Sequence, residues 1–127
     1  MKEYNVAIVG ATGIVGKEII AILERRDFPV RDLRLLAAEQ SVGMELPYKG
    51  EELVVQQLTE TSFEGIDISL FSSGATVSQK FAPYAVKAGA VVIDTTSAFR
   101  MEPNVPLIVP EVNPHTLASH KGMIASP

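Results

Sequence analysis

The chain has 127 residues, of which 46% are hydrophobic, 20% charged and 6% aromatic, and it carries a formal net charge of −4. A chain of this length hides roughly two-thirds of the surface that its unfolded form exposes, so residues 1–127 are enough for one domain with a proper core and too few for two. The acidic balance with scattered charges argues against nucleic acid binding, because contacts to the phosphate backbone need clustered lysine and arginine side chains.

The N-terminal part of the chain predicts a strand followed by an amphipathic helix. A short apolar run, Val6 to Val9, ends at Gly10 and is typical of a strand buried on both faces. From Ile14 to Arg26, apolar residues recur at helical spacing, and Asp27-Phe28-Pro29 ends this helix. Because the apolar run is too short for a signal-peptide core or a membrane span, we expect a cytoplasmic protein.

The later elements continue an alternation of strands and helices. Strands are expected at Leu33 to Ala38, Asp67 to Ser72, Ala90 to Asp94 and Met123 to Ala125, a helix at Val77 to Ala88, and a hairpin from Leu46 to Tyr48 and Leu53 to Gln57. The proline-rich stretch Met101 to Pro114 is expected to run extended across the surface. This order predicts an α/β protein with a Rossmann-like, doubly wound and mainly parallel sheet.

Three glycines mark the turn between the first strand and the first helix. They fall in Gly10-Ala11-Thr12-Gly13-Ile14-Val15-Gly16, with the spacing G-x-x-G-x-x-G. A glycine turn at this place lets the backbone approach a pyrophosphate at the N–H groups and positive dipole end of the helix, while the last glycine allows close helix–strand packing. The alternative is that the glycines only permit a tight turn. The flanking strand and helix favour dinucleotide binding.

Five motifs in order resemble those of aspartate-semialdehyde dehydrogenases. They are Gly10 to Gly16, Leu35 to Gly43, Leu70 to Gly74, Asp94 to Arg100 and Val105 to Asn113, so that the resemblance spans essentially the whole chain. The resemblance implies an NADP-dependent oxidoreductase that reductively dephosphorylates β-aspartyl phosphate to aspartate semialdehyde. It further implies a role in lysine, methionine and threonine biosynthesis, a small-molecule substrate and a homodimer of the full-length protein. Neither nucleic acid nor a membrane is an expected partner.

The resemblance implies site residues at the ends of several strands. Cofactor contacts are expected from Gly10, Thr12, Gly13, Ile14 and Val15 at the pyrophosphate, from Gln40 and Ser41 near the adenosine ribose, and from Ser72, Ser73 and Gly74 at the third strand's end. In open α/β sheets, ligands lie at the carboxyl ends of the strands, which independently favours these positions. Arg100 would hold the acyl phosphate or free phosphate, although it could instead be a solvated arginine paired with Glu102. Asp94, Thr95 and Ser97 either border the same site or cap the following turn.

The residues expected near the adenosine ribose depart from the family pattern. Gln40-Ser41 stands where the family often has Arg-Ser, and Ala38 stands where it often has serine. Losing a guanidinium removes a charge-assisted contact to a 2′-phosphate of about 1.5–3 kcal/mol, and Glu39 adds a nearby negative charge. We therefore expect NADP as the cofactor with a reduced preference over NAD.

No catalytic residue is expected in this chain. In the family the nucleophile is a cysteine in an Asn-Cys-Ser/Thr motif directly after Ala-x-Pro, and this chain has no cysteine and ends with Ala125-Ser126-Pro127. The resemblance implies a catalytic and dimerisation domain after residue 127, so the 127-residue chain alone is expected to be inactive. No metal site is expected either, because His115 and His120 have no acidic or cysteine partners at ligand spacing.

Two other functions remain open from the sequence. The missing cysteine is compatible with a non-catalytic nucleotide-binding module, or with a paralogue that has lost its thiol. The second is a relative of the N-acetyl-glutamyl-phosphate reductases, which normally have tyrosine or phenylalanine in the glycine turn, where this chain has Ile14 and Val15.

Overall fold

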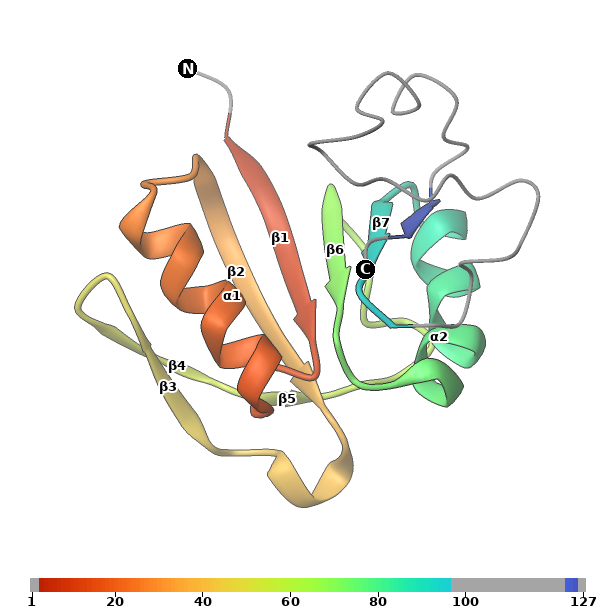
Figure 1. The fold of residues 1–127 in the computed structure, drawn as a ribbon, viewed down its shortest axis with the longest axis horizontal. Helices are drawn as coiled ribbons and strands as arrows, with labels where there is room; N and C mark the ends of the chain where they lie inside the picture. The colour runs from red at the N-terminus through yellow and green to blue at the C-terminus, as the bar shows by residue number, and fades with distance from the viewer. Residues whose placement is uncertain (1–2, 97–122, 126–127) are drawn as a thin grey trace.

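The computed structural model describes residues 3–96 and the backbone of residues 123–125. Its main sheet has six strands in the order β5-β2-β1-β6-β7-β8, and every neighbouring pair is parallel. These strands are β1 (Tyr4–Val9), β2 (Val30–Ala37), β5 (Gln56–Gln57), β6 (Ile68–Phe71), β7 (Val91–Asp94) and β8 (Met123–Ala125). Figure 1 shows α1 (Ile14–Arg25) beside β1 and β2, and α2 (Ala75–Lys87) beside β7. The expected parallel α/β sheet is confirmed, with β8 as its last described strand.

Strand β1 lies in the middle of the sheet and contributes to two hydrophobic cores. Its residues Val6 and Ile8 pack in one core with Ile20 of α1, whereas Ala7 and Val9 pack in the other core with α2. Alternate side chains of a strand point to opposite faces, so the two helices cover opposite faces of the sheet. A strand covered on both faces needs apolar residues at every position, which explains the unbroken apolar run in the sequence.

Three elements begin at least two residues earlier than expected. β1 begins at Tyr4 rather than Val6. β2 begins at Val30 rather than Leu33, because Val30 and Asp32 already pair with β1. The polar residues at the start of β2 are exposed, so an apolar pattern does not reveal this part of the strand. α2 begins at Ala75 rather than Val77, directly after Gly74, which is its N-cap residue.

The hairpin is confirmed, but its second strand is shorter than expected. β3 (Glu45–Tyr48) and β4 (Glu51–Val54) form a separate antiparallel sheet. The expectation of one strand from Leu53 to Gln57 is wrong, because Gln56 and Gln57 leave the hairpin and pair in parallel with β2 as β5. The buried Val55 marks the change of direction, where its N–H donates to the carbonyl of Met44 at 2.7 Å.

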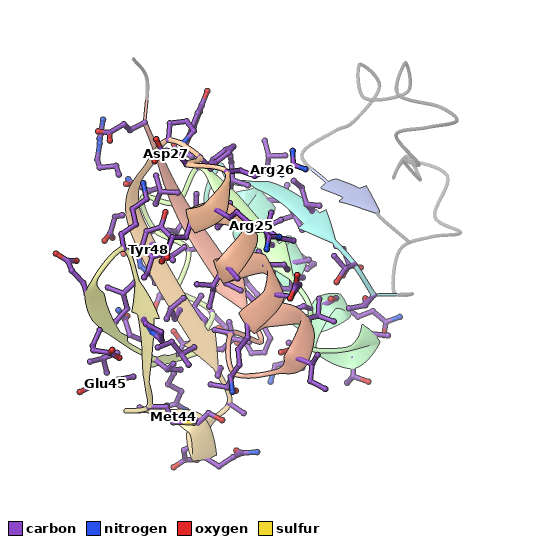
Figure 2. The ribbon with its side chains drawn as sticks, turned by 60° about the vertical axis from the view of Figure 1, so that its left-hand side comes forward. Arg25, Arg26, Asp27, Met44, Glu45 and Tyr48 are labelled. Carbon is purple, nitrogen blue, oxygen red and sulfur yellow. The ribbon has the colours of Figure 1, made fainter. Side chains whose placement is uncertain are left out.

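The tip of the hairpin is fastened to the C-terminal end of α1. Figure 2 shows Tyr48 on the side of the hairpin that faces α1, in the same core as Ile20. The Lys49 N–H donates to Glu24 Oε1 at 2.6 Å, and Lys49 Nζ donates to Asp27 Oδ1 at 2.7 Å. This hydrogen bond and the lysine charge lower the pKa of Asp27, and the same bond raises the pKa of Lys49. Both side chains are exposed, so the ion pair adds little to stability.

Several expectations lie outside the described residues. They are the extended stretch Met101 to Pro114, and the individual residues Ser97, Arg100, His115 and His120. Within residues 3–96, no helix has the length and apolar character needed to cross a bilayer.

Candidate functional site

The glycine turn leaves β1 at the carboxyl edge of the sheet. Gly10 has a φ of +88°, a left-handed conformation that glycine adopts without steric penalty. Its N–H donates to the carbonyl of Leu36 in β2 at 2.9 Å, and the Gly13 N–H donates to the Gly10 carbonyl at 3.1 Å. These backbone bonds fix a short connection between the sheet and the first turn of α1.

Two of the three glycines are required by close packing within the protein. A β-carbon on Gly16 would collide with the Gly10 carbonyl oxygen and would lie 2.9 Å from Ala11 Cα. A β-carbon on Gly10 would lie 2.5 Å from Ser73 Oγ. Gly16 therefore brings α1 against the end of β1, as expected from the spacing, and Gly10 brings the turn against the segment after β6.

Gly13 is different because nothing in the described part of the protein requires a glycine there. Its φ of −79° suits any residue, and a β-carbon would meet only the Gly10 carbonyl, at an ordinary 3.5 Å. Gly13 is the N-cap residue of α1, and this cap has no side-chain hydrogen bond and no acidic residue in the first turn. An uncapped helix N-terminus beside an open glycine is an arrangement that suits a bound anion.

The first turn of α1 exposes apolar side chains. Ile14 is 91% exposed and Val15 is 49% exposed. Both residues were expected at the pyrophosphate, and they lie on the first turn of α1 directly after the open Gly13. In this position their backbone N–H groups belong to the free helix end, while their side chains face away from the core.

The structure brings the turn after β2 to the glycine turn. β2 ends at Ala37 and is followed by the 3-10 helix η1 (Glu39–Ser41). Thr12 Oγ1 donates to Ser41 Oγ at 3.3 Å, so two of the expected site residues are in contact although 29 positions separate them. Gln40 lies in the same short helix and is exposed.

The segment after β6 also lies at the carboxyl edge of the sheet, where it contacts the end of β1. Ser72 donates from its backbone N–H and its hydroxyl to the carbonyl of Val9, at 2.9 Å and 3.0 Å. Ser73 lies against Gly10, and Gly74, the N-cap residue of α2, has a φ of +107°. β1 and β6 are neighbours whose helices cover opposite faces, so their ends form the point at which α/β sheets bind ligands.

The polar residues that end β7 make hydrogen bonds within the protein. Asp94 is fully buried, and its Oδ1 accepts hydrogen bonds from Ser78 Oγ at 2.9 Å and from the Thr96 N–H at 3.0 Å. Thr95 Oγ1 donates to the Phe71 carbonyl at 2.8 Å. Asp94 therefore caps the turn that follows it. Ser78 and Thr96 were missed from the sequence, where serine and threonine carry no sign of such a partner.

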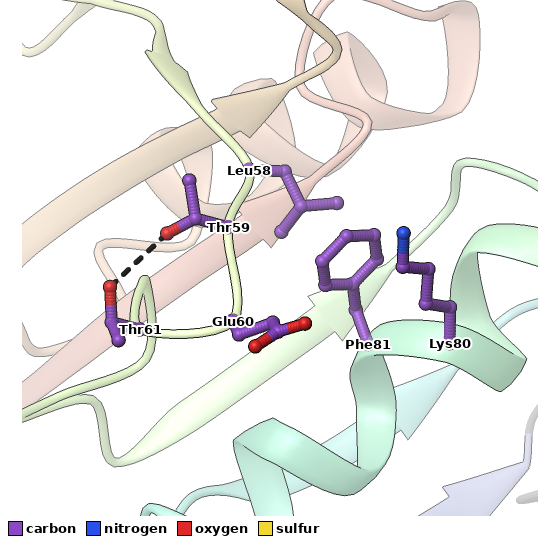
Figure 3. Close-up of a pocket in the computed structure, with 6 residues that line it drawn as sticks. All are labelled: Leu58, Thr59, Glu60, Thr61, Lys80 and Phe81. Atoms are coloured by element: carbon purple, nitrogen blue, oxygen red, sulfur yellow. Dashed lines mark hydrogen bonds between the residues drawn. The ribbon is translucent and has the colours of Figure 1, made fainter.

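A hollow of about 400 Å³ lies near the end of β2, between the segment after β5 and α2. Figure 3 shows Phe81 of α2 facing Leu58, with Lys80 beside it. The Leu58 N–H donates to the Ala37 carbonyl at 2.9 Å, which ties this hollow to the last residue of β2. The glycine turn does not line it. Among residues 3–96 and 123–125 no group of three or more potential ligand side chains is suited to a metal ion.

Comparison with known proteins gives consistent matches. Residues 5–120 match the family model for the semialdehyde dehydrogenase NAD binding domain. An aspartate-semialdehyde dehydrogenase of Bacillus subtilis (strain 168) is 54% identical over 126 residues, which are 99% of this chain and 36% of that protein. The chain thus spans little more than a third of the length of this curated relative.

Solved structures agree with this match. Aspartate semialdehyde dehydrogenase II of Vibrio cholerae, complexed with ASA, superposes with a TM-score of 0.95 at 45% identity, over 99% of this chain and 42% of that one. The Candida albicans enzyme with NADP gives a TM-score of 0.81 at 25% identity, over 97% of this chain and 42% of that one.

Proposed function

Because this chain belongs to the semialdehyde dehydrogenase NAD-binding domain family, we propose that it is the nucleotide-binding part of an aspartate-semialdehyde dehydrogenase. The observation that carries this proposal is the uncapped N-terminus of α1 beside the open Gly13. A pyrophosphate would accept hydrogen bonds from the free N–H groups of Ile14 and Val15 and would gain from the helix dipole. The names of the relatives do not favour the N-acetyl-glutamyl-phosphate reductases.

Each part of the site would hold one part of the cofactor. The turn at Thr12 and Gly13 would hold the pyrophosphate, and Gln40 and Ser41 would border the adenosine ribose. The segment Ser72 to Gly74 would border the cofactor at the end of β6. Once bound, the nicotinamide supplies the hydride, while these residues orient it. The hydrogen bond between Thr12 and Ser41 supports this division, because it joins the expected pyrophosphate and ribose regions.

The activity of the whole protein is a proposal that rests on the family. We propose reductive dephosphorylation of β-aspartyl phosphate with NADPH, in the biosynthesis of lysine, methionine and threonine, by a cytoplasmic homodimer. Arg100 would hold the phosphate of this substrate, because a planar guanidinium suits its oxygen atoms. The catalytic cysteine and the dimerisation domain would follow residue 127 in the full-length protein.

The test of nucleotide binding is calorimetric titration of the full-length protein with NADP⁺ and NAD⁺. We expect saturable binding of one nucleotide per chain, and we expect amide NMR shifts confined to the glycine turn, η1 and the segment after β6. Absence of binding, or shifts located elsewhere in the domain, would contradict the proposal. Nicotinamide alone serves as the control, because it lacks the pyrophosphate that the turn is proposed to hold.

We expect a weak preference between the two cofactors. Gln40 is a neutral side chain in the exposed helix η1, and Glu39 beside it repels a 2′-phosphate. Introducing Gln40→Arg is expected to strengthen NADPH binding about tenfold or more, with little effect on NADH, because the new guanidinium pairs with the 2′-phosphate. Dissociation constants of both nucleotides measure this effect. Gln56→Arg adds the same charge on β5 as a control, and a hundredfold NADPH preference of the unmodified protein would refute the prediction.

The 127-residue chain alone is expected to be catalytically inactive. Acyl transfer requires a nucleophile, and this chain has no cysteine to provide one. The measurement is phosphate-dependent reduction of NADP⁺ in the presence of aspartate semialdehyde, with the full-length protein as the positive control. Turnover by the 127-residue chain would show that this assignment of the chemistry is wrong.

A further inference from the structure

A buried carboxylate ends β7, the neighbour of β6, whose following segment is proposed to border the cofactor. Asp94 is the last residue of β7 and is 0% exposed. Both of its oxygens are occupied, because Oδ1 accepts from Ser78 Oγ and the Thr96 N–H, and Oδ2 accepts from Thr96 Oγ1 at 2.9 Å. Burial of a carboxylate is unfavourable unless it is well hydrogen-bonded, so breaking these bonds would be costly. The cluster therefore holds Ser78 and Thr96 in fixed positions relative to the end of β7.

The Asp94 cluster connects to the site through the first turn of α2. Ser78 is also 0% exposed, and its backbone N–H donates to the carbonyl of Gly74 at 3.1 Å. The side chain of Ser78 thus binds the Asp94 carboxylate, and its backbone N–H binds the N-cap residue of α2. Two consecutive hydrogen bonds lead from Asp94 to the segment that would border the cofactor.

This segment in turn lies against the glycine turn. Ser73 precedes Gly74 and approaches Gly10 so closely that a β-carbon on Gly10 would lie 2.5 Å from Ser73 Oγ and 3.0 Å from its backbone nitrogen. Because Ser73 and Gly10 are packed this closely, neither can move without displacing the other. A shift at the start of α2 would therefore displace the turn that follows β1.

We propose that Asp94 is a positioning residue of the nucleotide site. Through Ser78 it fixes the start of α2, and through Ser73 it holds the glycine turn in the geometry that receives a pyrophosphate. The inference rests on the proposed nucleotide-binding function, and it assigns an effect on affinity to a fully buried side chain that acts through Ser78.

The test compares three variants of the full-length protein. Asp94→Ala removes all three accepted hydrogen bonds and is expected to weaken NADP⁺ binding about tenfold or more. Asp94→Asn keeps the two bonds to Oδ1, and Thr96 Oγ1 can accept from the new amide, so we expect affinity within about threefold of the unmodified protein. Ser78→Ala cuts the connection while leaving the carboxylate in place, and it is expected to weaken binding about fivefold.

Asp67→Ala is the matched control. Asp67 precedes β6 at the opposite edge of the sheet, where its Oδ2 accepts from the Asn5 N–H at 2.8 Å. Its loss should lower the melting temperature without changing the dissociation constant of NADP⁺.

The outcomes separate the inference from the function on which it rests. If the unmodified protein does not bind NADP⁺, the proposed function fails. If it binds but Asp94→Ala or, where that variant does not fold, Ser78→Ala binds equally well, the positioning role is overturned. A loss of affinity that Asp94→Asn restores, at a melting temperature no lower than that of Asp67→Ala, supports it.

Discussion

Replacing Gly16 with alanine is expected to destabilise the protein by about 3 kcal/mol and to abolish nucleotide binding. The new β-carbon would collide with the Gly10 carbonyl oxygen and would lie 2.9 Å from Ala11 Cα, both of which are backbone atoms that cannot rotate away. Helix α1 must therefore move from the end of β1. This loss outweighs the gain of about 1 kcal/mol that alanine brings to a helix interior.

Urea unfolding followed by circular dichroism measures the loss of stability for Gly16→Ala. Gly50→Ala is the control, because Gly50 has a φ of +82° at the hairpin tip and nothing lies within 4 Å of its β-carbon position. That variant should lose only about 1–2 kcal/mol through its left-handed backbone and should bind nucleotide normally. A Gly16→Ala variant as stable as the unmodified protein would mean that α1 does not pack on β1 in this way.

The parts of the fold that followed from the sequence are those whose environment is uniform. β1 is buried on both faces, so its residues form an unbroken apolar run that identifies it as a central strand. The start of β2 is exposed and polar, at Arg31 and Asp32, although it pairs with β1. There the backbone hydrogen bonds to a neighbouring strand decide the structure, and these partners are not visible in a local pattern.

The short strand β5 shows a second limit of local patterns. Gln56 and Gln57 have no strand-like alternation, and the sequence around them reads as part of the hairpin. The structure places them beside Leu36 and Ala37 of β2. There the parallel backbone pairing, rather than the side-chain pattern, makes them a strand. Such an element depends on the tertiary contact and could not be separated from the hairpin beforehand.

The candidate site was predictable where backbone requirements select the residue. Gly10 and Gly16 are required by close packing, so their spacing in the sequence predicts the turn. The contact of Thr12 with Ser41 depends on two loops meeting at one edge of the sheet. The expected position of the loops follows from the parallel topology, but the hydrogen bond itself does not.

Replacing Gly13 with alanine is expected to weaken NADP⁺ binding about tenfold or more while leaving the fold intact. Gly13 has a φ of −79°, and its β-carbon would meet only the Gly10 carbonyl, at 3.5 Å, so the protein itself tolerates alanine. Alanine restricts the unfolded chain but is a poorer N-cap residue than glycine, so the two effects oppose each other and stability should change by less than about 1 kcal/mol. The methyl group would instead occupy the space beside the free end of α1, where a pyrophosphate must approach the backbone.

Thermal unfolding and calorimetric titration of the same preparation distinguish the effects of the Gly13→Ala and Gly16→Ala substitutions. Gly16→Ala should lose stability and binding together, whereas Gly13→Ala should lose binding alone. A β-carbon at Gly13 meets no protein atom closer than 3.5 Å, whereas one at Gly16 collides with backbone atoms. A further comparison of NADPH with NADH shows whether the lost contact is to the pyrophosphate or to the ribose. Because both nucleotides contain the pyrophosphate, Gly13→Ala should weaken the binding of both equally. Unchanged affinity in a folded Gly13→Ala protein would mean that the nucleotide does not approach the N-terminus of α1, and the site would have to lie elsewhere on the sheet edge.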